Sequence, residues 1–455
     1  MAKVLLVQPN YNTDTPLLWK KEAWMPLALV ALATFVREKS EGGHDIKILD
    51  RNLHYDNDKF IKLLDRFQPD IVGMTCYTSP AIKDIMQVAK LVKENSEALV
   101  FVGGVHATLE PKSLLDYEYI DYTIKGEGEE TLLELCGLVD KRKATSKNIL
   151  KLKNINYNEM RPFLNLNDCP LPDYDLLEFE KYVVTTFYTS RGCPGRCKFC
   201  YNLGRQLRFY NTQKTIEMFD RVIEKYKVKE FTIADDNFAN LSKRTTDVCK
   251  SLSKHNCVFF CFLRTDLAHD KVLRELKQAG CLTIQFGFES GSQRVLDFIN
   301  KRTTVEQNAN AIRQCRKYGI FVEGSFMLGL PTETAKEAVQ TLKFIENTGL
   351  KIAFTKIYKP FPSTELYDLC IKKGLIKRPK NLIDWVAFSN INNDGVNLNV
   401  SEIPTPLLLD LLKKTNKHEG SQYLKKFFIL ARNGHLDYAL LRIRQIVKDK
   451  LVGRV

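Results

Sequence analysis

Three cysteines lie close together in the sequence, with the spacing of a metal-binding loop. Cys193, Cys197 and Cys200 fall within eight residues, in the segment Gly-Cys-Pro-Gly-Arg-Cys-Lys-Phe-Cys. Thiolates are soft ligands that bind iron–sulfur clusters or zinc, and three of them on one short loop can surround a single cluster. The chemistry to expect at this segment is therefore that of a metal centre.

The number of thiolates separates the two kinds of metal site. A closed structural zinc site needs four ligands, usually in two paired halves, and the sequence holds no second Cys-x-x-Cys and no closely spaced His pair. Cys257 and Cys261 lie along an expected strand, where four residues of rise hold the thiols roughly 13 Å apart. Three thiolates on a four-iron cluster would leave one iron open to a second molecule. A zinc knuckle or chance clustering is the alternative.

A series of alternating strands and helices positions this loop. The sequence predicts strands at 183–188, 230–234, 258–263, 282–288, 321–327 and 353–358, with helices between them, for instance at 212–226, 270–279, 305–318 and 334–347. Six βα units in one run predict a partial barrel of parallel strands of the TIM type, whose chemistry lies at the C-terminal ends of the strands. The cysteine segment follows the first of these strands directly.

An earlier series predicts a second α/β domain. Strands are expected at 3–7, 45–49, 71–75, 99–102 and 122–124, and helices at 26–39, 59–67, 81–94 and 129–139. This alternation is typical of a doubly wound, flavodoxin-like (Rossmann-like) domain with an open parallel sheet. Ligands of such sheets bind beyond the carboxyl ends of the strands, so the loops there are the candidate binding residues.

The expected boundaries follow from composition. Residues 1–140 form the first domain, and the polar stretch 141–178, which contains Pro170 and Pro172, is the expected linker. Residues 179–380 form the barrel domain. Residues 381–455 are expected to be helical, with amphipathic segments at 406–414, 420–433 and 435–450. A chain of 455 residues exceeds the size at which one core keeps growing, which agrees with several domains.

Composition narrows the class of protein. Hydrophobic residues make up 44% and charged residues 27%, as in ordinary globular proteins. The longest apolar runs, such as 71–74 and 98–102, are far shorter than the roughly 20 residues of a membrane span, and residues 1–7 lack the features of a signal peptide. We therefore expect a cytoplasmic protein, in which most of the nine other cysteines are small buried hydrophobes. The net charge of +14 is spread along the chain without a nucleic-acid motif, so a nucleic-acid partner is not expected.

The pattern Cys-x-x-x-Cys-x-aromatic-Cys after the first strand of a βα series resembles the signature of the radical S-adenosylmethionine superfamily. The resemblance implies an oxygen-sensitive [4Fe–4S] cluster on Cys193, Cys197 and Cys200. Its open iron would hold the amino and carboxylate groups of S-adenosylmethionine, and an electron from the cluster would release a 5′-deoxyadenosyl radical. Phe199 would pack beside the adenine.

Three further strand ends match this family. By resemblance, Glu289 in the segment 286–291 would hold the ribose hydroxyls, since a carboxylate accepts two hydrogen bonds. Arg264 would meet the carboxylate of S-adenosylmethionine, and Gly329 in the segment 324–331 would let backbone approach the adenine. The ordinary alternatives are a helix start after Glu289, a salt bridge from Arg264 to Asp266, and a plain turn at Gly329.

A doubly wound domain before a radical domain resembles the cobalamin-binding radical S-adenosylmethionine enzymes. The matching stretches are 25–29, 69–73, 102–108 and 125–130. The cobalamin contacts that the resemblance implies are Thr75, Tyr77, Thr78, Gly103, Gly104, Val105, His106, Gly126, Glu127 and Gly128. Glycines let a flat base slide against the backbone, hydroxyls can bind the cofactor tail, and the amides of the last glycine pair could meet its phosphate.

One departure from the cobalamin-binding pattern concerns the cobalt ligand. Domains that bind cobalt through histidine carry Asp-x-His-x-x-Gly after the first strand, whereas residues 8–12 here read Gln-Pro-Asn-Tyr-Asn. The lower face of cobalt would then be left to water, to no ligand, or to a residue outside this motif. His106 is expected to make a local hydrogen bond rather than to bind metal.

These resemblances imply a cobalamin-dependent radical methyltransferase. It would methylate an unactivated carbon or phosphorus centre of a small molecule through methylcobalamin and a 5′-deoxyadenosyl radical, with electrons from a donor such as flavodoxin or ferredoxin. One alternative keeps the same cofactors but performs a cyclisation or oxidation without methyl transfer. Another is a non-catalytic metal-binding protein.

Overall fold

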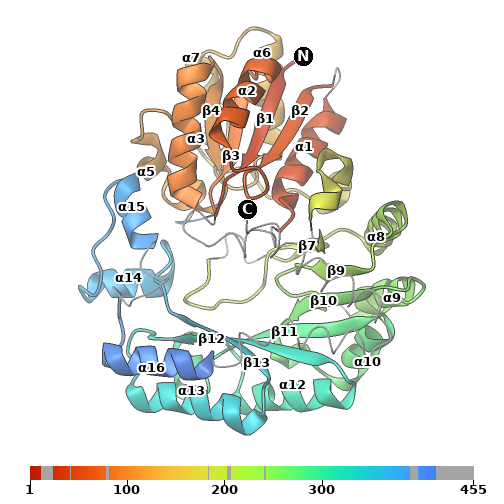
Figure 1. Ribbon diagram of the computed structural model, residues 1–455, viewed down its shortest axis with the longest axis vertical. Coiled ribbons are helices and arrows are strands. Elements are labelled where there is room, and N and C mark those ends of the chain that lie inside the picture. The colour runs from red at the N-terminus through yellow and green to blue at the C-terminus, as the bar shows by residue number, and fades with distance from the viewer. Residues whose placement is uncertain are drawn as a thin grey trace, which may run out of the picture. The chain divides into compact units, whose positions relative to one another are not determined.

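The computed structural model describes residues 1–11, 24–40, 43–77, 81–182, 184–201, 206–239, 242–389 and 398–416. The described chain divides into two compact units (Figure 1). The first contains the residues up to 182 together with 378–389, and the second contains 184–377 together with 398–416. Within these described ranges, no helix has the length and apolar character needed to cross a membrane.

The first unit is built on a five-stranded parallel sheet with the order β2-β1-β3-β4-β5. Its strands are β1 (Lys3–Gln8), β2 (Asp45–Asp50), β3 (Ile71–Thr75), β4 (Leu99–Gly103) and β5 (Tyr122–Thr123). This order is that of the flavodoxin-like doubly wound fold, whose ligands bind where the strand order reverses, at β1 and β3. The expected fold of this domain is confirmed.

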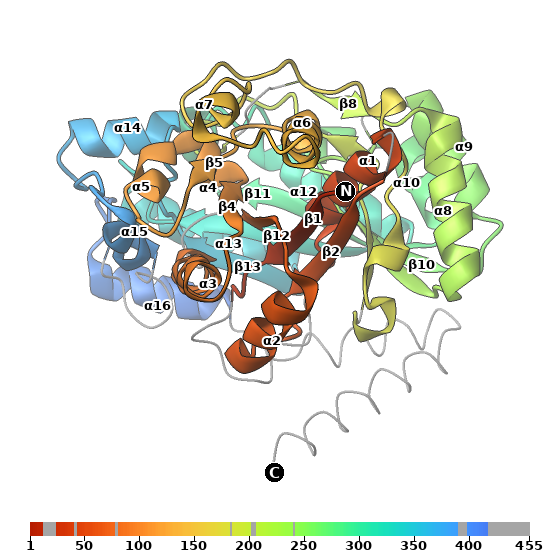
Figure 2. The ribbon, with the colours of Figure 1, turned by 90° about the horizontal axis from the view of Figure 1, so that it is seen from above.

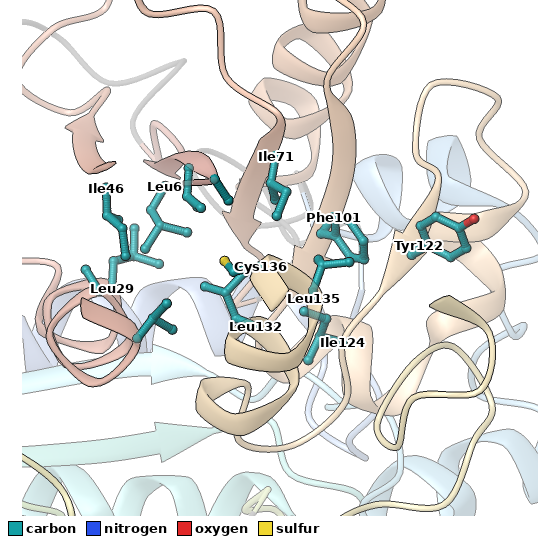
Figure 3. Packing of buried hydrophobic residues seen from close by; sticks show 14 of the residues in the cluster. Leu6, Leu29, Ile46, Ile71, Phe101, Tyr122, Ile124, Leu132, Leu135 and Cys136 are labelled. Atoms are coloured by element: carbon teal, nitrogen blue, oxygen red, sulfur yellow. The ribbon is translucent and has the colours of Figure 1, made fainter. Parts of the chain in front are cut away.

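Helices cover both faces of this sheet, as Figure 2 shows. Helices α1 (Leu27–Lys39) and α6 (Glu129–Asp140) pack together on one face, and α2 (Asn57–Phe67) and α3 (Ile82–Asn95) on the other. Two short helices, α4 (Val105–Leu109) and α5 (Pro111–Leu115), follow β4. The core between the sheet and α1 and α6 contains Leu6, Phe101, Leu29 and Leu135 (Figure 3). Burying each such side chain contributes about 1.5–3 kcal/mol.

Two segments outside the expected first domain belong to this unit. The expected linker begins with α7 (Ser146–Ile149) and packs on the unit through buried Ile149 and Ile155, and Ile155 forms a β-bridge with Ile124. It continues through short 3₁₀ turns at Leu166–Asp168, Tyr174–Leu176 and Phe179–Lys181. Helix α15 (Leu382–Ser389) returns later in the chain, with Trp385 against His106. A few buried apolar side chains therefore attach segments whose overall composition is polar.

The second unit is built on six parallel strands in consecutive order, as expected for a partial barrel. They are β6 (Thr185–Phe187), β9 (Glu230–Ile233), β10 (Val258–Leu263), β11 (Cys281–Glu289), β12 (Phe321–Leu328) and β13 (Ile352–Ile357). The connecting helices are α8 (Thr212–Tyr226), α9 (Ser242–Leu252), α10 (Asp270–Gln278), α11 (Gln293–Phe298), α12 (Val305–Lys317), α13 (Ala335–Thr348) and α14 (Glu365–Lys372), with a 3₁₀ turn at Thr265–Leu267. Capping boxes at Thr304 and Thr334 begin α12 and α13.

The last described helix, α16 (Thr405–Thr415), packs against α13 and β13. Its Leu408 and Leu411 join Leu328 of β12 and Ala338 of α13 in a small apolar cluster. The helix expected at 406–414 is thus present. The helices expected at 420–433 and 435–450 lie outside the described residues.

Candidate functional site

The three clustered cysteines lie on a loop that leaves the end of β6. A short antiparallel pair, β7 (Ser190–Arg191) and β8 (Arg208–Phe209), closes the loop at its base. Cys193 and Cys197 are half-buried and Cys200 is exposed, whereas the other nine cysteines are buried, as expected. Solvent access therefore distinguishes the same three thiols as the sequence spacing does.

The cysteine loop brings two of its thiols close to one point. Around Gly195, the Sγ atoms of Cys193 and Cys197 lie 3.3 and 4.0 Å from the point that a Cβ would occupy. Thiolates on a four-iron cluster bind separate irons. Two neighbouring thiols and the exposed Cys200 on the same loop are a donor set that suits such a cluster.

The base of the loop is held by a buried carboxylate that follows β9. The carboxylate of Asp235 accepts hydrogen bonds from the backbone N–H groups of Thr189 (2.6 Å) and Ser190 (3.1 Å), and from the Thr189 hydroxyl. Arg244 of α9 is also buried and donates to the carbonyl of Thr189 (3.1 Å). Burial raises the pKa of Asp235, and the hydrogen bonds from Thr189 and Ser190 oppose that shift. Asp235 and Arg244 therefore fix where the loop begins.

Glu289 lies at the end of β11 beside the cysteine loop. Its backbone is in the left-handed region, with φ +63°, next to an irregularity in the pairing with β12. Its Oε1 accepts a hydrogen bond from the Lys301 ammonium at 2.7 Å, and both side chains are 11% exposed. A Cβ at Gly287 would lie 2.4 Å from this oxygen, so the pair needs glycine there. Sequence reasoning found Glu289 but missed Lys301.

Arg264 reaches the same loop from the end of β10. Its guanidinium pairs with Asp266 through two contacts of 3.0 Å, so the salt bridge that the sequence offered as the alternative is present. Its Nη1 also lies 3.9 Å from the Cβ position of Gly195, and its Nη2 donates to the Lys301 carbonyl at 3.3 Å. One arginine thus contacts both the cysteine loop and the segment that carries Lys301.

Two other expected residues of this unit have simpler surroundings. Phe199 is half-buried between two of the cysteines in sequence. Gly329 has φ +81°, its N–H donates to the Glu333 carboxylate at 2.7 Å, and its Cβ position lies 3.2 Å from Leu408. The turn at Gly329 is therefore in contact with other parts of the protein, and its approach to adenine stays a prediction.

In the first unit, Gly104 makes the ends of β3 and β4 approach closely. Its φ is +91°, and a Cβ there would lie 2.9 Å from both the Cys76 carbonyl oxygen and Thr75 Oγ1. The Cβ position of Gly103 meets only ordinary contacts, the nearest at 3.7 Å. Tyr77 is 63% exposed beyond β3, whereas Thr78 lies outside the described residues. The predicted cofactor edge thus combines a tight backbone approach with one exposed aromatic side chain, that of Tyr77.

His106 is part of the interior of this unit. Its Nε2 lies 2.9 Å from Ser113 Oγ, and its ring meets the edge of Trp385 at 5.1 Å. Burial lowers the pKa of His106 to about 4, so the ring is neutral at pH 7. The local hydrogen bond that the sequence favoured is present, and the cofactor contact of His106 stays a prediction. Val105 beside it is half-buried.

The loop after β5 is bound within the protein rather than open to a phosphate. The N–H of Gly126 donates to Thr108 Oγ1 at 2.9 Å, and the Glu127 carboxylate accepts from the N–H of Leu164 at 2.9 Å. Gly128 caps α6, whose first turn holds two glutamates that repel anions. The Gly126 N–H is therefore already bonded within the protein, and the predicted phosphate contacts of Gly126 and Gly128 stay a prediction.

Comparisons with known proteins match both units. Residues 187–345 match the family model of the radical SAM superfamily, and residues 21–136 match that of the B12 binding domain. An uncharacterised methyltransferase of Pyrococcus horikoshii is 34% identical over 388 residues, which is 81% of this chain and 82% of that protein. The anaerobic magnesium-protoporphyrin IX monomethyl ester cyclase of Rubrivivax gelatinosus is 29% identical over 392 residues, which is 80% of this chain and 69% of that protein.

A solved structure has the same fold. The radical S-adenosylmethionine methyltransferase TsrM from Kitasatospora setae, with cobalamin and a [4Fe–4S] cluster bound, aligns with a TM-score of 0.68 and 16% identity. The alignment covers 82% of this chain and 75% of that one. With a methyltransferase relative above 30% identity along four-fifths of both chains, this chain belongs to the cobalamin-binding radical S-adenosylmethionine enzymes, whose cofactors are a [4Fe–4S] cluster, S-adenosylmethionine and cobalamin.

Proposed function

We propose that the chain methylates an unactivated carbon or phosphorus atom of a small molecule, with Cys193, Cys197 and Cys200 as the cluster ligands. The observation that carries the proposal is the loop itself: three solvent-accessible thiols on a loop held by buried polar contacts, at the end of the first strand of a parallel sheet. When bound, the cluster supplies the electron that cleaves S-adenosylmethionine, and cobalamin carries the methyl group.

The protein's own side chains would orient S-adenosylmethionine. The Glu289 carboxylate has two acceptor oxygens, which suit the two hydroxyls of a ribose. Arg264 lies against the cysteine loop, where its guanidinium suits the carboxylate of a methionine group. Phe199, between two cluster ligands in sequence, offers an apolar face to the adenine. Asp235 acts through the loop, because it holds the backbone that leads into the first cysteine.

The cobalamin contacts that we retain lie at the ends of β3 and β4. Thr75 and Gly104 meet there, Gly103 and Val105 flank them along the chain, and Tyr77 extends into solvent. A glycine edge with neighbouring hydroxyls suits a nucleotide tail, because backbone and base can approach without an intervening Cβ.

The electron donor that we propose is a small acidic carrier such as flavodoxin or ferredoxin. The chain has a formal net charge of +14, which attracts an acidic partner in solution. A cluster with an open iron and accessible thiolates also needs a reducing compartment, for which we propose the cytoplasm.

A second candidate function is a radical cyclisation with the same cofactors. The observation that favours it is the similarity to the cyclase of Rubrivivax gelatinosus. The two functions differ in their products, because methylation of reduced cobalamin converts S-adenosylmethionine into S-adenosylhomocysteine, whereas cyclisation need not.

The test uses full-length protein purified without oxygen and reconstituted with iron, sulfide and cobalamin. After reduction with dithionite and addition of S-adenosylmethionine, mass spectrometry should detect 5′-deoxyadenosine together with S-adenosylhomocysteine. A variant with alanine at the three cluster cysteines should form no 5′-deoxyadenosine, whereas Cys315→Ala, which removes a buried thiol of the same unit, should retain it. 5′-Deoxyadenosine without S-adenosylhomocysteine would favour cyclisation. Absence of 5′-deoxyadenosine from the wild type would reject both.

A further inference from the structure

The turn that follows α11 is docked on the cysteine loop. The carbonyl of Ile299 accepts a hydrogen bond from the N–H of Lys198 at 2.9 Å, and the Asn300 side-chain amide donates to the carbonyl of Arg196 at 2.8 Å. Both contacts are made to backbone atoms between the first and last cluster cysteines. The turn 299–302 therefore holds the backbone of the cysteine loop, whichever side chains the loop carries at those positions.

This turn has a strained backbone. Asn300 has φ +53° and Arg302 has φ +57°, so two residues with side chains adopt the left-handed region within three positions. Such conformations cost about 1–3 kcal/mol each and persist where surrounding contacts determine them. The docking contacts and the Arg264 hydrogen bond to the Lys301 carbonyl are contacts of that kind.

The strained turn directs Lys301 into the protein. Its ammonium lies 2.7 Å from Glu289 Oε1, and a Cβ at Gly287 would come within 2.9 Å of the same ammonium. The Glu289 carboxylate, as an opposite charge within hydrogen-bond distance, stabilises the charged form of this buried ammonium. The lysine is therefore a fixed positive charge at neutral pH.

This charge belongs to a segment that is bonded to the surroundings of the cluster ligands. Arg264 donates to the Lys301 carbonyl at 3.3 Å, and its Nη1 lies 3.9 Å from the Cβ position of Gly195, which is 3.3 and 4.0 Å from the Sγ atoms of Cys193 and Cys197. The buried ion pair of Lys301 therefore lies beside the cysteine loop. In a poorly solvated site such charges interact strongly, because the effective dielectric constant is low.

We propose that Lys301 is a positioning residue whose buried ammonium, held by Glu289, makes the cluster on Cys193, Cys197 and Cys200 easier to reduce. The inference rests on the proposed function, because it requires the cluster. A positive charge beside the cluster stabilises the form that has gained an electron, and a negative charge destabilises it. Here the electron comes from the external reductant.

The test is a charge cycle of Lys301→Met, Glu289→Gln and the double variant. Each reconstituted full-length protein is titrated with dithionite in the absence of S-adenosylmethionine, and the cluster is followed by electron paramagnetic resonance. At a fixed potential, Lys301→Met should lower the ratio of reduced to oxidised cluster about tenfold, which is 59 mV for one electron. Glu289→Gln should raise the ratio, and the double variant should lie near the wild type.

Two further variants separate charge from packing. Lys301→Arg should restore the wild-type ratio, because it keeps the charge. Lys317→Met removes an equal charge from an exposed ion pair with Asp270 in the same unit and should leave the ratio unchanged. If the wild type assembles no cluster, the proposed function fails. If it assembles one and the two single variants shift the ratio in the same direction or not at all, the inference about Lys301 is overturned.

Lys301→Met leaves the buried Glu289 carboxylate without its partner and can therefore fail to fold. Glu289→Gln and the double variant remove that carboxylate, so a comparison of these two proteins still gives the sign of the effect of the Lys301 charge. Iron content per chain, measured for every variant, shows whether a change in signal reflects the potential or the loss of the cluster.

Discussion

Replacing Gly104 with alanine tests whether the ends of β3 and β4 are built around a missing side chain. The φ of +91° and ψ of −167° lie in a region that is essentially restricted to glycine, and residues held there cost about 1–3 kcal/mol. The new Cβ would also lie 2.9 Å from the Cys76 carbonyl oxygen and 3.1 Å from its nitrogen. These backbone atoms cannot rotate away from the new Cβ, and such overpacking costs about 1–3 kcal/mol more.

We therefore expect Gly104→Ala to lower the free energy of unfolding of the first unit by about 2–6 kcal/mol, from the strain and overpacking ranges together. Gly137→Ala is the matched control, because no described atom lies within 4 Å of its Cβ position in the middle of α6. Alanine there should stabilise the unit by about 0.5–1 kcal/mol, since glycine is the poorer helix former. The two substitutions add the same methyl group and should act in opposite directions.

Urea unfolding of full-length apo-protein, followed by circular dichroism, measures both changes. Retention of corrinoid on gel filtration gives a second readout: it should fall for Gly104→Ala and be unchanged for Gly137→Ala, if this edge holds cobalamin. An unfolding curve of Gly104→Ala within about 0.5 kcal/mol of the wild type, the range of neutral surface changes, would refute the close approach. Lost stability with full corrinoid retention would refute only the cofactor role.

Three other substitutions address the remaining structural claims. Asp235→Asn should reduce the iron content after reconstitution with little change in circular dichroism, because the amide nitrogen replaces the oxygen that accepts from the Thr189 hydroxyl, and a buried hydrogen bond lost in this way costs about 1–3 kcal/mol; unchanged iron content would show that Asp235 does not hold the base of the loop. Burial raises the pKa of Glu333 to about 7, so this carboxyl holds its proton more tightly in the folded state than in the unfolded state. The free energy of unfolding of the wild type should therefore fall by roughly 3 kcal/mol, relative to that of Glu333→Gln, as the pH rises from about 4.5 through 7. Thermal melts of both proteins at pH 5 and pH 8 check the sign. Trp385→Ala should cost about 3–5 kcal/mol in urea unfolding, whereas Ile383→Ala on the same helix, 67% exposed, should be nearly neutral; equal effects would argue against the docking of α15.

The sequence was sufficient for the features that depend on neighbours along the chain. The cysteine trio is contiguous, so its spacing and its place after a strand are visible without a structure. Short runs rich in β-branched and aromatic residues, separated by amphipathic helices, located the strands of both sheets, because this pattern is local in the sequence. His106 was assigned a local hydrogen bond for the same reason, and Ser113 provides it seven residues later.

Glycine patterns were less informative than they looked. Gly104 and Gly126 both follow strands and both have positive φ. The first is pressed against the backbone of β3, whereas the N–H of the second is taken by Thr108. A sequence shows that a backbone can bend at such a position but not which group will fill the space beside it.

Beyond Arg264 and Glu289, the surroundings of the cysteine loop were decided by tertiary structure. Asp235 follows the neighbouring strand β9, and Lys301 follows a helix two strands further along the sheet. In the sequence, Asp235 has only the ordinary interpretation of a helix N-cap, and Lys301 has no local pattern that sets it apart from a surface charge. Parallel strands deliver their carboxyl ends to one edge whatever the distance along the chain, so the strand order, and not the spacing of residues, determines which charges meet the three thiolates.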